Sequence, residues 1–181
     1  MIKGIKIVLR EKRLKDAAND YAWKSDAELA YLDATLPLVM PFSEYLFSYA
    51  EELHYANTRG HRYAIETLDG RHIGNCSYYN LDENKEEAEL GILIGERSFW
   101  EKSYGADAVI ALLNHGFEEL NLKRIYLHTL EWNVRAKKCF QKCGFVPCGN
   151  INRGGQNFII MDIKKANYKK PLPHPVHYRP E

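Results

Sequence analysis

Apolar and polar residues follow two rhythms along this chain, one typical of strands and one typical of helices. Six short runs with apolar, β-branched or alternating residues are predicted as strands: residues 6–9, 62–68, 72–79, 90–94, 124–130 and 158–163. The second and third of these runs flank Asp69-Gly70, which is a strong hairpin signal, so they are expected to pair antiparallel.

Apolar residues recur at helical spacing between these runs. Four helices are expected: residues 16–32, residues 43–55, a helix that begins within residues 100–106 and runs to about residue 120, and residues 133–144. Ser43 follows two prolines and can cap the second helix, whereas Asn133 can cap the last one and Gly144 can end it.

Length and composition favour one domain over several. The chain has 181 residues, of which 45% are hydrophobic and 27% are charged, enough for one buried core. We expect a single domain over residues 1–163 and an extended C-terminal tail over residues 164–181, where lysine, proline and histidine dominate. Docking of this tail on the domain or on a partner is its expected role.

Charge and cysteine usage exclude several classes of partner. A formal net charge of +1 gives no basic field for nucleic acid, and no apolar stretch is long enough for a signal peptide or a membrane span. A cytoplasmic protein that binds neither nucleic acid nor membrane is the expectation. Its four cysteines, Cys76, Cys139, Cys143 and Cys148, have no zinc-site spacing, so no metal is expected and the thiols are interpreted as reduced.

The segment from Ala88 to Ala108 carries the clearest chemical signal. An apolar strand flanked by Gly91 and Gly95 leads through a short turn into the start of a helix. Backbone N–H groups at a helix start lack partners within the helix and lie at the positive end of its dipole. The segment is therefore predicted to hold a pyrophosphate, as a nucleotide cofactor would require.

This segment resembles the cofactor loop of the GNAT acetyltransferases, in particular their RimJ/RimL-like branch. The family places a Q/R-x-x-G-x-G/A loop after a strand, and the matching slots here hold Trp100, Ser103 and Gly105. Tryptophan is familiar in the first slot of that branch, whereas Ser103 replaces a usual glycine. The resemblance extends from Trp23-x-x-Asp26 through Asn133-Val134-Arg135-Ala136 to Gly144-Phe145. It implies an α/β fold of the α+β type, with a mixed, mostly antiparallel central sheet flanked by helices on both faces.

The activity that this resemblance implies is direct transfer of an acetyl group from acetyl-CoA to a primary amine in a ternary complex. In the family, the cofactor strand splays from its neighbour, so that pantetheine inserts like a strand and a strand amide faces the acetyl oxygen. The residues that the resemblance assigns to the cofactor are Leu93, Ile94, Gly95, Trp100, Glu101, Lys102, Ser103, Tyr104, Gly105, Ala106, Asn133, Ala136 and Phe140.

Three residues are candidates for catalysis. Glu89 opens the cofactor strand, and His128 occupies a slot where related alanine acetyltransferases carry a glutamate base; either could deprotonate the amine. Asn133 matches a family position near the thiol end of the cofactor. Many relatives place a tyrosine that protonates the departing thiolate where this chain has Phe140. A phenyl ring has no proton to donate. Tyr126 or Tyr104 could substitute, or the thiolate could leave without an acid.

The acceptor is the least specified part of the interpretation. In the family the first helices and the hairpin wall the acceptor pocket, which would involve Trp23, Asp26, Tyr78 and Tyr79. A protein N-terminus, an amino sugar, a polyamine or an aminoglycoside-like amine are all open acceptors, and a homodimer is a possible assembly. The alternatives are a catalytically inactive module that binds CoA or acyl-CoA, and an interaction protein.

Overall fold

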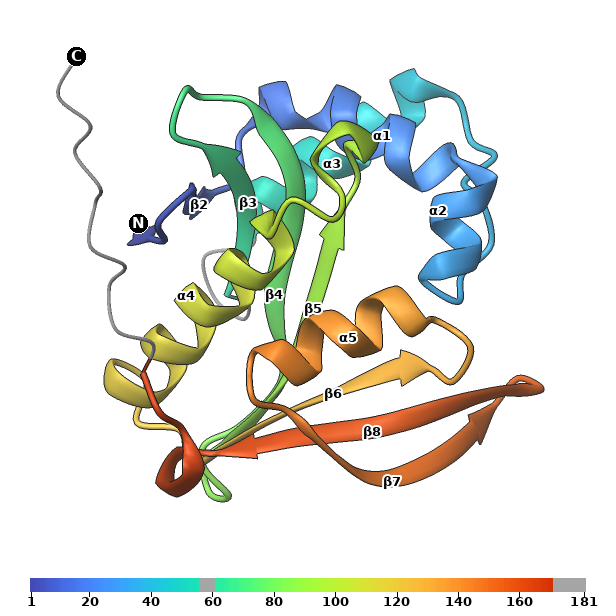
Figure 1. Ribbon diagram of the computed structural model, residues 1–181. Coiled ribbons are helices and arrows are strands. Elements are labelled where there is room, and N and C mark those ends of the chain that lie inside the picture. Colours follow the sequence, from blue (N-terminus) through green and yellow to red (C-terminus); the bar gives the residue numbers. More distant parts are fainter. Residues whose placement is uncertain (56–60, 171–181) are drawn as a thin grey trace, which may run out of the picture.

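The computed structural model describes residues 1–55 and 61–170, which build one eight-stranded sheet (Figure 1). The strands are β1 (Ile2–Lys3), β2 (Ile7–Glu11), β3 (Arg62–Thr67), β4 (His72–Asp82), β5 (Glu87–Ile94), β6 (Arg124–Leu130), β7 (Val146–Arg153) and β8 (Gln156–Lys164). They lie in the order β1-β2-β3-β4-β5-β6-β8-β7. Only the β5–β6 pair is parallel among the described strands, which confirms the predicted mixed, mostly antiparallel sheet.

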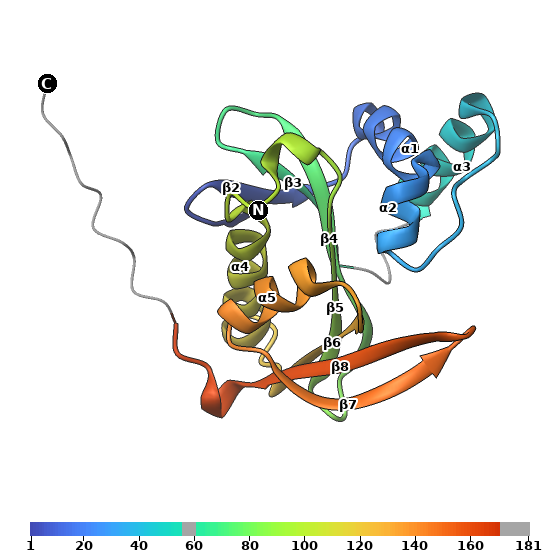
Figure 2. The ribbon, with the colours of Figure 1, turned by 45° about the vertical axis from the view of Figure 1, so that its right-hand side comes forward.

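Helices cover both faces of the sheet, as predicted. They are α1 (Ala17–Ser25), α2 (Ala27–Leu32), α3 (Phe42–Tyr55), α4 (Tyr104–Glu118) and α5 (Val134–Lys142), with short 3-10 turns η1 (Leu14–Asp16), η3 (Arg97–Phe99) and η4 (Lys165–Asn167). Figure 2 shows β4 and β5 almost edge-on, with α4 and α5 on one side and α1, α2 and α3 on the other. Two layers of helices therefore meet the central strands from opposite sides.

Helix α4 supplies much of the core on its side of the sheet. Its residues Val109, Leu112 and Leu113 have no exposed surface, which confirms the predicted apolar face. Gly116 lies on the same face, and a Cβ at this position would come within 2.7 Å of the Ile125 side chain of β6. The close approach of helix and sheet at Gly116 helps to set the direction of α4 across the sheet.

The parallel pair β5–β6 separates soon after it forms. Glu87, Ala88 and Glu89 pair with the first three residues of β6, Arg124 to Tyr126. Beyond Glu89, the β6-facing edge of β5 pairs with no strand in the described part of the chain. Apart from Ile94 O, which accepts from the Trp100 indole, the backbone groups of this edge from Leu90 to Ile94 are consequently available to another extended chain.

The prediction of one helix over residues 16–32 was wrong, because the helix is broken at Asp26. This residue has extended backbone angles, and its carboxylate accepts a hydrogen bond from Leu29 N at 2.9 Å. Asp26 therefore caps a second helix, α2, instead of continuing the first. Arg97 of η3 binds Asp26 at 2.8 Å and Glu28 at 2.7 Å, which ties the start of α2 to the turn after β5.

Strand β7 was not predicted, whereas the hairpin β3–β4 was. β7 begins Val146-Pro147 and contains Gly149, two residues that weaken a strand pattern. Proline is tolerated at this position because β7 is the last strand of the sheet, and its outer edge pairs with no described strand. At the confirmed β3–β4 turn, Gly70 has a φ of 87°, which glycine adopts without strain.

The first part of the expected tail lies against α4. The Tyr168 hydroxyl donates a hydrogen bond to Asn114 at 2.9 Å, and its ring packs on Phe117 with 5.2 Å between centroids. Residues 171–181 of the expected tail lie outside the described residues. No described helix is long and apolar enough to cross a membrane, and the described residues contain no group of three or more metal-ligating side chains.

Candidate active site

The turn between β5 and α4 presents a row of free backbone donors. Among the described residues, no acceptor is in hydrogen-bonding position for the N–H groups from Glu101 to Ala106. Glu101 and Ser103 both adopt left-handed backbone conformations, with φ values of 60° and 68°. Successive N–H groups in such a turn at a helix start form a concave anion site. The turn therefore has the geometry of an anion site, and its binding of a phosphate stays a prediction.

This loop is fastened to the start of the sheet. The Asp107 carboxylate, in the first turn of α4, accepts hydrogen bonds from Ile5 N at 3.0 Å and Lys6 N at 2.7 Å. The Lys6 ammonium donates to Lys102 O at 3.0 Å and lies over the Tyr104 ring. Lys102 and Tyr104 thus face the β1–β2 turn. Neither lines either of the two cavities described below, although both were predicted to contact the cofactor.

Ser103 closes the loop in a conformation that glycine would adopt more easily. A non-glycine residue in the left-handed region costs about 1–2 kcal/mol. We expect Ser103→Gly to raise the free energy of unfolding by up to about 1 kcal/mol, because part of the gain is lost to the greater freedom of glycine in the unfolded chain. The matched control is Lys102→Gly, where φ is not positive and stability should fall. Thermal unfolding measures both, and equal signs for the two variants would contradict this explanation.

Trp100 joins the loop to β5 and to α5. Its indole N–H donates to Ile94 O at 2.6 Å, and the guanidinium of Arg135 lies 3.5 Å from the ring centroid. A cation this close to an indole face is attracted by the ring electrons. The residue in the first slot of the loop therefore positions Arg135 beside the phosphate-type turn.

A cavity of about 520 Å³, the first cavity, lies against this turn. Its walls are the end of α2, β5 from Ile92 to Ile94, the loop from Phe99 to Ala106, and α5. The predicted cofactor residues that line it are Leu93, Ile94, Trp100, Glu101, Ser103, Gly105, Ala106, Asn133, Ala136 and Phe140. The free edge of β5 and the free N–H groups of the loop thus face one continuous space.

Gly95, which was predicted to contact the cofactor, makes close contacts within the sheet and with Trp23. Its N–H donates to Ile73 O at 3.0 Å, so this amide is already used within the sheet. A Cβ at Gly95 would overlap the indole of Trp23. Gly95 does not line the first cavity, and its lack of a side chain makes room for Trp23 instead.

Three cations on α5 line the first cavity and were not predicted. Arg135, Lys138 and Lys142 lie three and four residues apart, which places them along one side of the helix. Guanidinium and ammonium groups are the usual partners of phosphate oxygens. The spacing of these three residues can be read from the sequence. It would have predicted a cationic side of the helix once the helix was assigned.

Asn133 and Phe140 both line the first cavity. The Asn133 Oδ1 accepts from Ala136 N at 3.1 Å, which confirms the predicted cap of α5, and the side-chain amide nitrogen has no partner among the described residues. Phe140 is 8% exposed and packs on Phe145. Neither Tyr126 nor Tyr104 lines the cavity, so within the described part of the chain neither of these phenols is brought to the position of Phe140.

Glu89 and His128 contact each other but line neither this cavity nor the second one. Glu89 Oε1 lies 2.6 Å from His128 Nδ1, Asn80 donates to the other carboxylate oxygen at 2.8 Å, and Arg153 lies 3.3 Å from His128 Nε2. The parallel register sets this contact, since Glu89 lies beside Tyr126 and His128 follows two residues later on the same face. Their role as the base stays a prediction.

A second cavity of about 480 Å³ lies under α1 and α3 on the opposite face of the sheet. It shares Asp33, Ile92 and Leu93 with the first cavity. Of the residues predicted to wall an acceptor pocket, Trp23 and Tyr79 line it, whereas Tyr78 is buried in the core and Asp26 caps α2. The two cavities therefore meet near the C-terminal end of β5, at Ile92 and Leu93.

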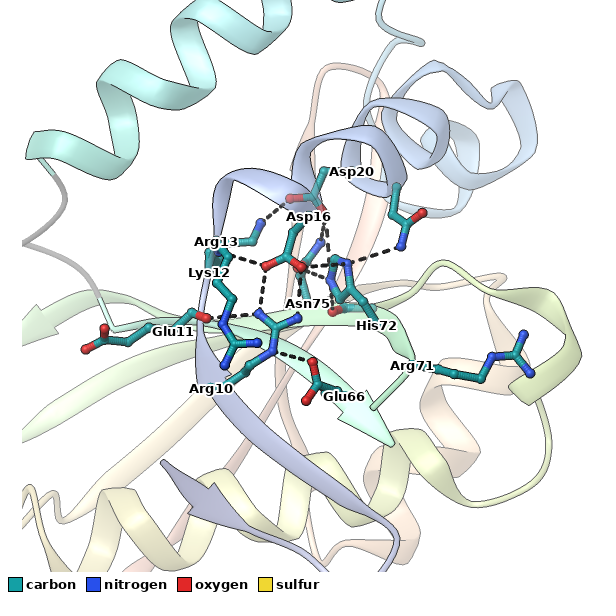
Figure 3. A network of polar contacts seen from close by, with 12 residues as sticks. Arg10, Glu11, Lys12, Arg13, Asp16, Asp20, Glu66, Arg71, His72 and Asn75 are labelled. Carbon is teal, nitrogen blue, oxygen red and sulfur yellow. Dashed lines mark hydrogen bonds and ion pairs between the residues drawn. The ribbon is translucent and has the colours of Figure 1, made fainter. Parts of the chain in front are cut away.

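A buried polar network supports the wall of the second cavity (Figure 3). Arg10 binds Asp16 through two nitrogens at 2.7 and 2.8 Å and Glu66 through its Nε at 2.5 Å. Asp20, which lines the cavity, is bound by Asn75 at 2.6 Å and by Lys12 at 2.5 Å. The two ring nitrogens of His72 lie 3.6 Å from the Asp16 carboxylate and 4.0 Å from the Asp20 carboxylate, and Figure 3 shows both contacts.

Comparisons with known proteins agree with this geometry. The family description "Acetyltransferase (GNAT) domain" matches residues 6–146. The uncharacterized N-acetyltransferase p20 of Bacillus licheniformis is 30% identical over 94 residues, which span 52% of this chain and only 47% of p20. A spermine/spermidine N(1)-acetyltransferase of Bacillus subtilis is 26% identical over 77% of this chain and 86% of its own length.

A solved structure shares the fold. Spermidine N-acetyltransferase from Vibrio cholerae, in complex with CoA and spermine, superposes with a TM-score of 0.78 over 90% of this chain and 98% of its own, at 23% identity. The family match spans most of the sheet, both cavities and the phosphate-type turn. The chain therefore belongs to the GNAT acetyltransferase family.

Proposed function

We propose that this protein transfers the acetyl group of acetyl-CoA to the primary amine of a small molecule, with acetyl-CoA in the first cavity and the amine in the second. The observation that carries the proposal is the meeting of the two cavities at Ile92 and Leu93. A thioester that lies along β5 would end where an amine from the other face of the sheet can reach it. Proximity of this kind removes much of the entropic barrier to a reaction between two molecules.

The residues of the first cavity fit acetyl-CoA in three places. The free N–H groups of residues 101–106 fit a pyrophosphate, and Arg135, Lys138 and Lys142 supply positive charge beside them. The unpaired edge of β5 fits the amide groups of pantetheine, which can bond to it as a strand would. One similar solved structure, the spermidine N-acetyltransferase from Vibrio cholerae, contains CoA, which is consistent with this cofactor.

The chain's own residues would then orient the two reactants. When bound, acetyl-CoA supplies a thioester whose C–S bond breaks as the amine nitrogen forms the new C–N bond. A backbone N–H of the β5 edge, with the free amide of Asn133, can stabilise charge on the acetyl oxygen. Phe140 supplies no proton, and a thiol whose ordinary pKa is about 8.5 leaves without help from an acid.

Two finer assignments belong to the same proposal. Trp100 in the first slot of the loop supports a place in the RimJ/RimL-like branch of the family. The relatives named as spermidine and spermine acetyltransferases make polyamines an obvious class of acceptor to test. A cytoplasmic location and a homodimer are carried forward from the sequence as parts of this proposal.

Acetyl-CoA is expected to stabilise the protein against thermal unfolding, by about 2.7 kcal/mol at a hundredfold excess over its dissociation constant. Pantetheine, which lacks the pyrophosphate, should stabilise it much less. Release of thiol from acetyl-CoA with a panel of amines then tests catalysis. Absence of a thermal shift at millimolar acetyl-CoA would refute the cofactor site, whereas a shift without thiol release for any amine would identify an inactive CoA-binding module.

A further inference from the structure

Most charges in the second cavity are compensated within the protein. Asp20 binds Lys12 and Asn75, and Glu52 of α3 forms an ion pair with Arg62 of β3. Glu11 follows Arg10, which points toward α1, and a strand sends successive side chains to opposite faces. Its carboxylate is therefore directed toward α4, away from the space under α1.

Two charges that line the cavity have no such partner. No described side chain lies within ion-pair or hydrogen-bonding distance of the Asp33 carboxylate or the Lys24 ammonium, although each feels the charge of the other. Both side chains keep exposed surface, and the Lys24 ammonium lies over the Tyr45 ring, 5.3 Å from its centroid. Partial loss of hydration raises the pKa of Asp33 and lowers the pKa of Lys24, with the nearby Lys12 charge adding to the effect on Lys24. Both shifts have the sign expected of a charge that protein atoms partly shield from water.

A buried hydroxyl adds a third unused group. Tyr49 of α3 is 4% exposed and lines the cavity, and its hydroxyl is directed toward Asp20 without completing a hydrogen bond. Burial raises the pKa of this phenol, so it keeps its proton and remains a donor. Unpaired buried polar groups are rare, and in a binding site they mark positions that a ligand satisfies.

We infer that the acceptor is an amino acid, whose ammonium group binds Asp33 and whose carboxylate binds Lys24 with help from Tyr49. This inference rests on the proposed function and narrows its acceptor. Asp33 lies at the junction of the two cavities, so an amine held there is next to the acetyl end of the first cavity. A polyamine has a second cation where this cavity offers Lys24, and like charges at close range repel.

The test compares each amino acid with its own amide, which keeps the amine but lacks the anion. At saturating acetyl-CoA, we expect kcat/KM of the best amino acid to exceed that of its amide, and that of spermidine, by at least tenfold. Lys24→Met should lower this ratio about tenfold, mainly through KM of the acid. Asp33→Asn should lower kcat/KM for acid and amide alike. Lys15→Met and Glu44→Gln, at exposed positions, are matched controls. They should leave kcat/KM for the acid, relative to the amide and to spermidine, unchanged.

Several outcomes overturn the inference. A higher kcat/KM of the natural protein for spermidine than for any amino acid would overturn it. The same holds if Lys24→Met leaves the ratio of kcat/KM for acid and amide unchanged. Lack of thiol release with every amine would refute the proposed function rather than this inference alone. In that case, calorimetry of amino acid binding to the CoA-loaded protein decides the inference, since binding that Lys24→Met weakens supports it and no binding refutes it.

Discussion

Gly105→Asp is expected to abolish acetyl-CoA binding while the protein stays folded. Gly105 is the second residue of α4 and lines the first cavity, so an aspartate there would project beside a pyrophosphate. Two unit charges of the same sign about 4 Å apart near a protein surface repel by about 4 kcal/mol. This corresponds to about a thousandfold loss of affinity. Calorimetric titration with acetyl-CoA measures it.

The same variant should unfold less readily than the natural protein, although it binds acetyl-CoA far less tightly. An acidic side chain in the first turn of a helix is favoured by the helix dipole, by about 0.3–1 kcal/mol. Gly105→Ala is the steric control, because its Cβ would lie 3.5 Å from Ile94 and 3.8 Å from Cys139, which are ordinary contacts. The alanine variant should therefore keep most of its affinity. Binding by Gly105→Asp within tenfold of the natural protein would show that the phosphates lie elsewhere.

Local signals in the sequence were enough to predict the phosphate-type turn and most strands. An apolar strand, a turn and a helix start are contiguous between Leu90 and Ala106, so their geometry depends little on the rest of the chain. The Asp69-Gly70 hairpin is equally local. Even Ser103, which departs from the glycine of the family loop, takes the left-handed conformation that the turn demands.

The acceptor side could not be predicted in this way. Lys24 and Asp33 come from α1 and from the end of α2, and their relation to β5 depends on how two helices lie on the sheet. Charged residues on helices are usually solvated, so nothing in their spacing marks them. The contact of Glu89 with His128 likewise depends on the parallel register of β5 and β6.

Two further features of the fold, the helix break at Asp26 and strand β7, were not predicted, for a different reason. The break at Asp26 was missed because apolar spacing continues across it, although Asp before a helical segment is a known capping signal. Strand β7 was missed because Pro147 argues against a strand, and only its place at the sheet edge makes that proline harmless. Tertiary position decided both cases.

Asp16→Asn is expected to cost the largest amount of stability of any substitution considered. Asp16 is 2% exposed and holds both terminal nitrogens of Arg10, itself 4% exposed (Figure 3). Removing one partner of a buried ion pair leaves an uncompensated charge and typically costs about 3–5 kcal/mol. Many domains have only about 5–15 kcal/mol in total. Urea unfolding at pH 7 measures the loss, and Glu44→Gln, an exposed carboxylate on α3, is the control.

The loss should fade in acid, and the sign follows from the pKa of Asp16. Burial opposes its ionised form, but hydrogen bonds from Arg10 and from Arg13 N outweigh burial and hold the pKa below its ordinary value. A carboxyl with a depressed pKa stabilises the fold above its unfolded pKa, about 3.9 for aspartate, and the contribution is lost as pH falls through the folded value. The natural protein should therefore lose its advantage over Asp16→Asn below about pH 4. An advantage that persists unchanged at lower pH, or a loss under about 1 kcal/mol at pH 7, would show that Arg10 is compensated by Glu66 instead.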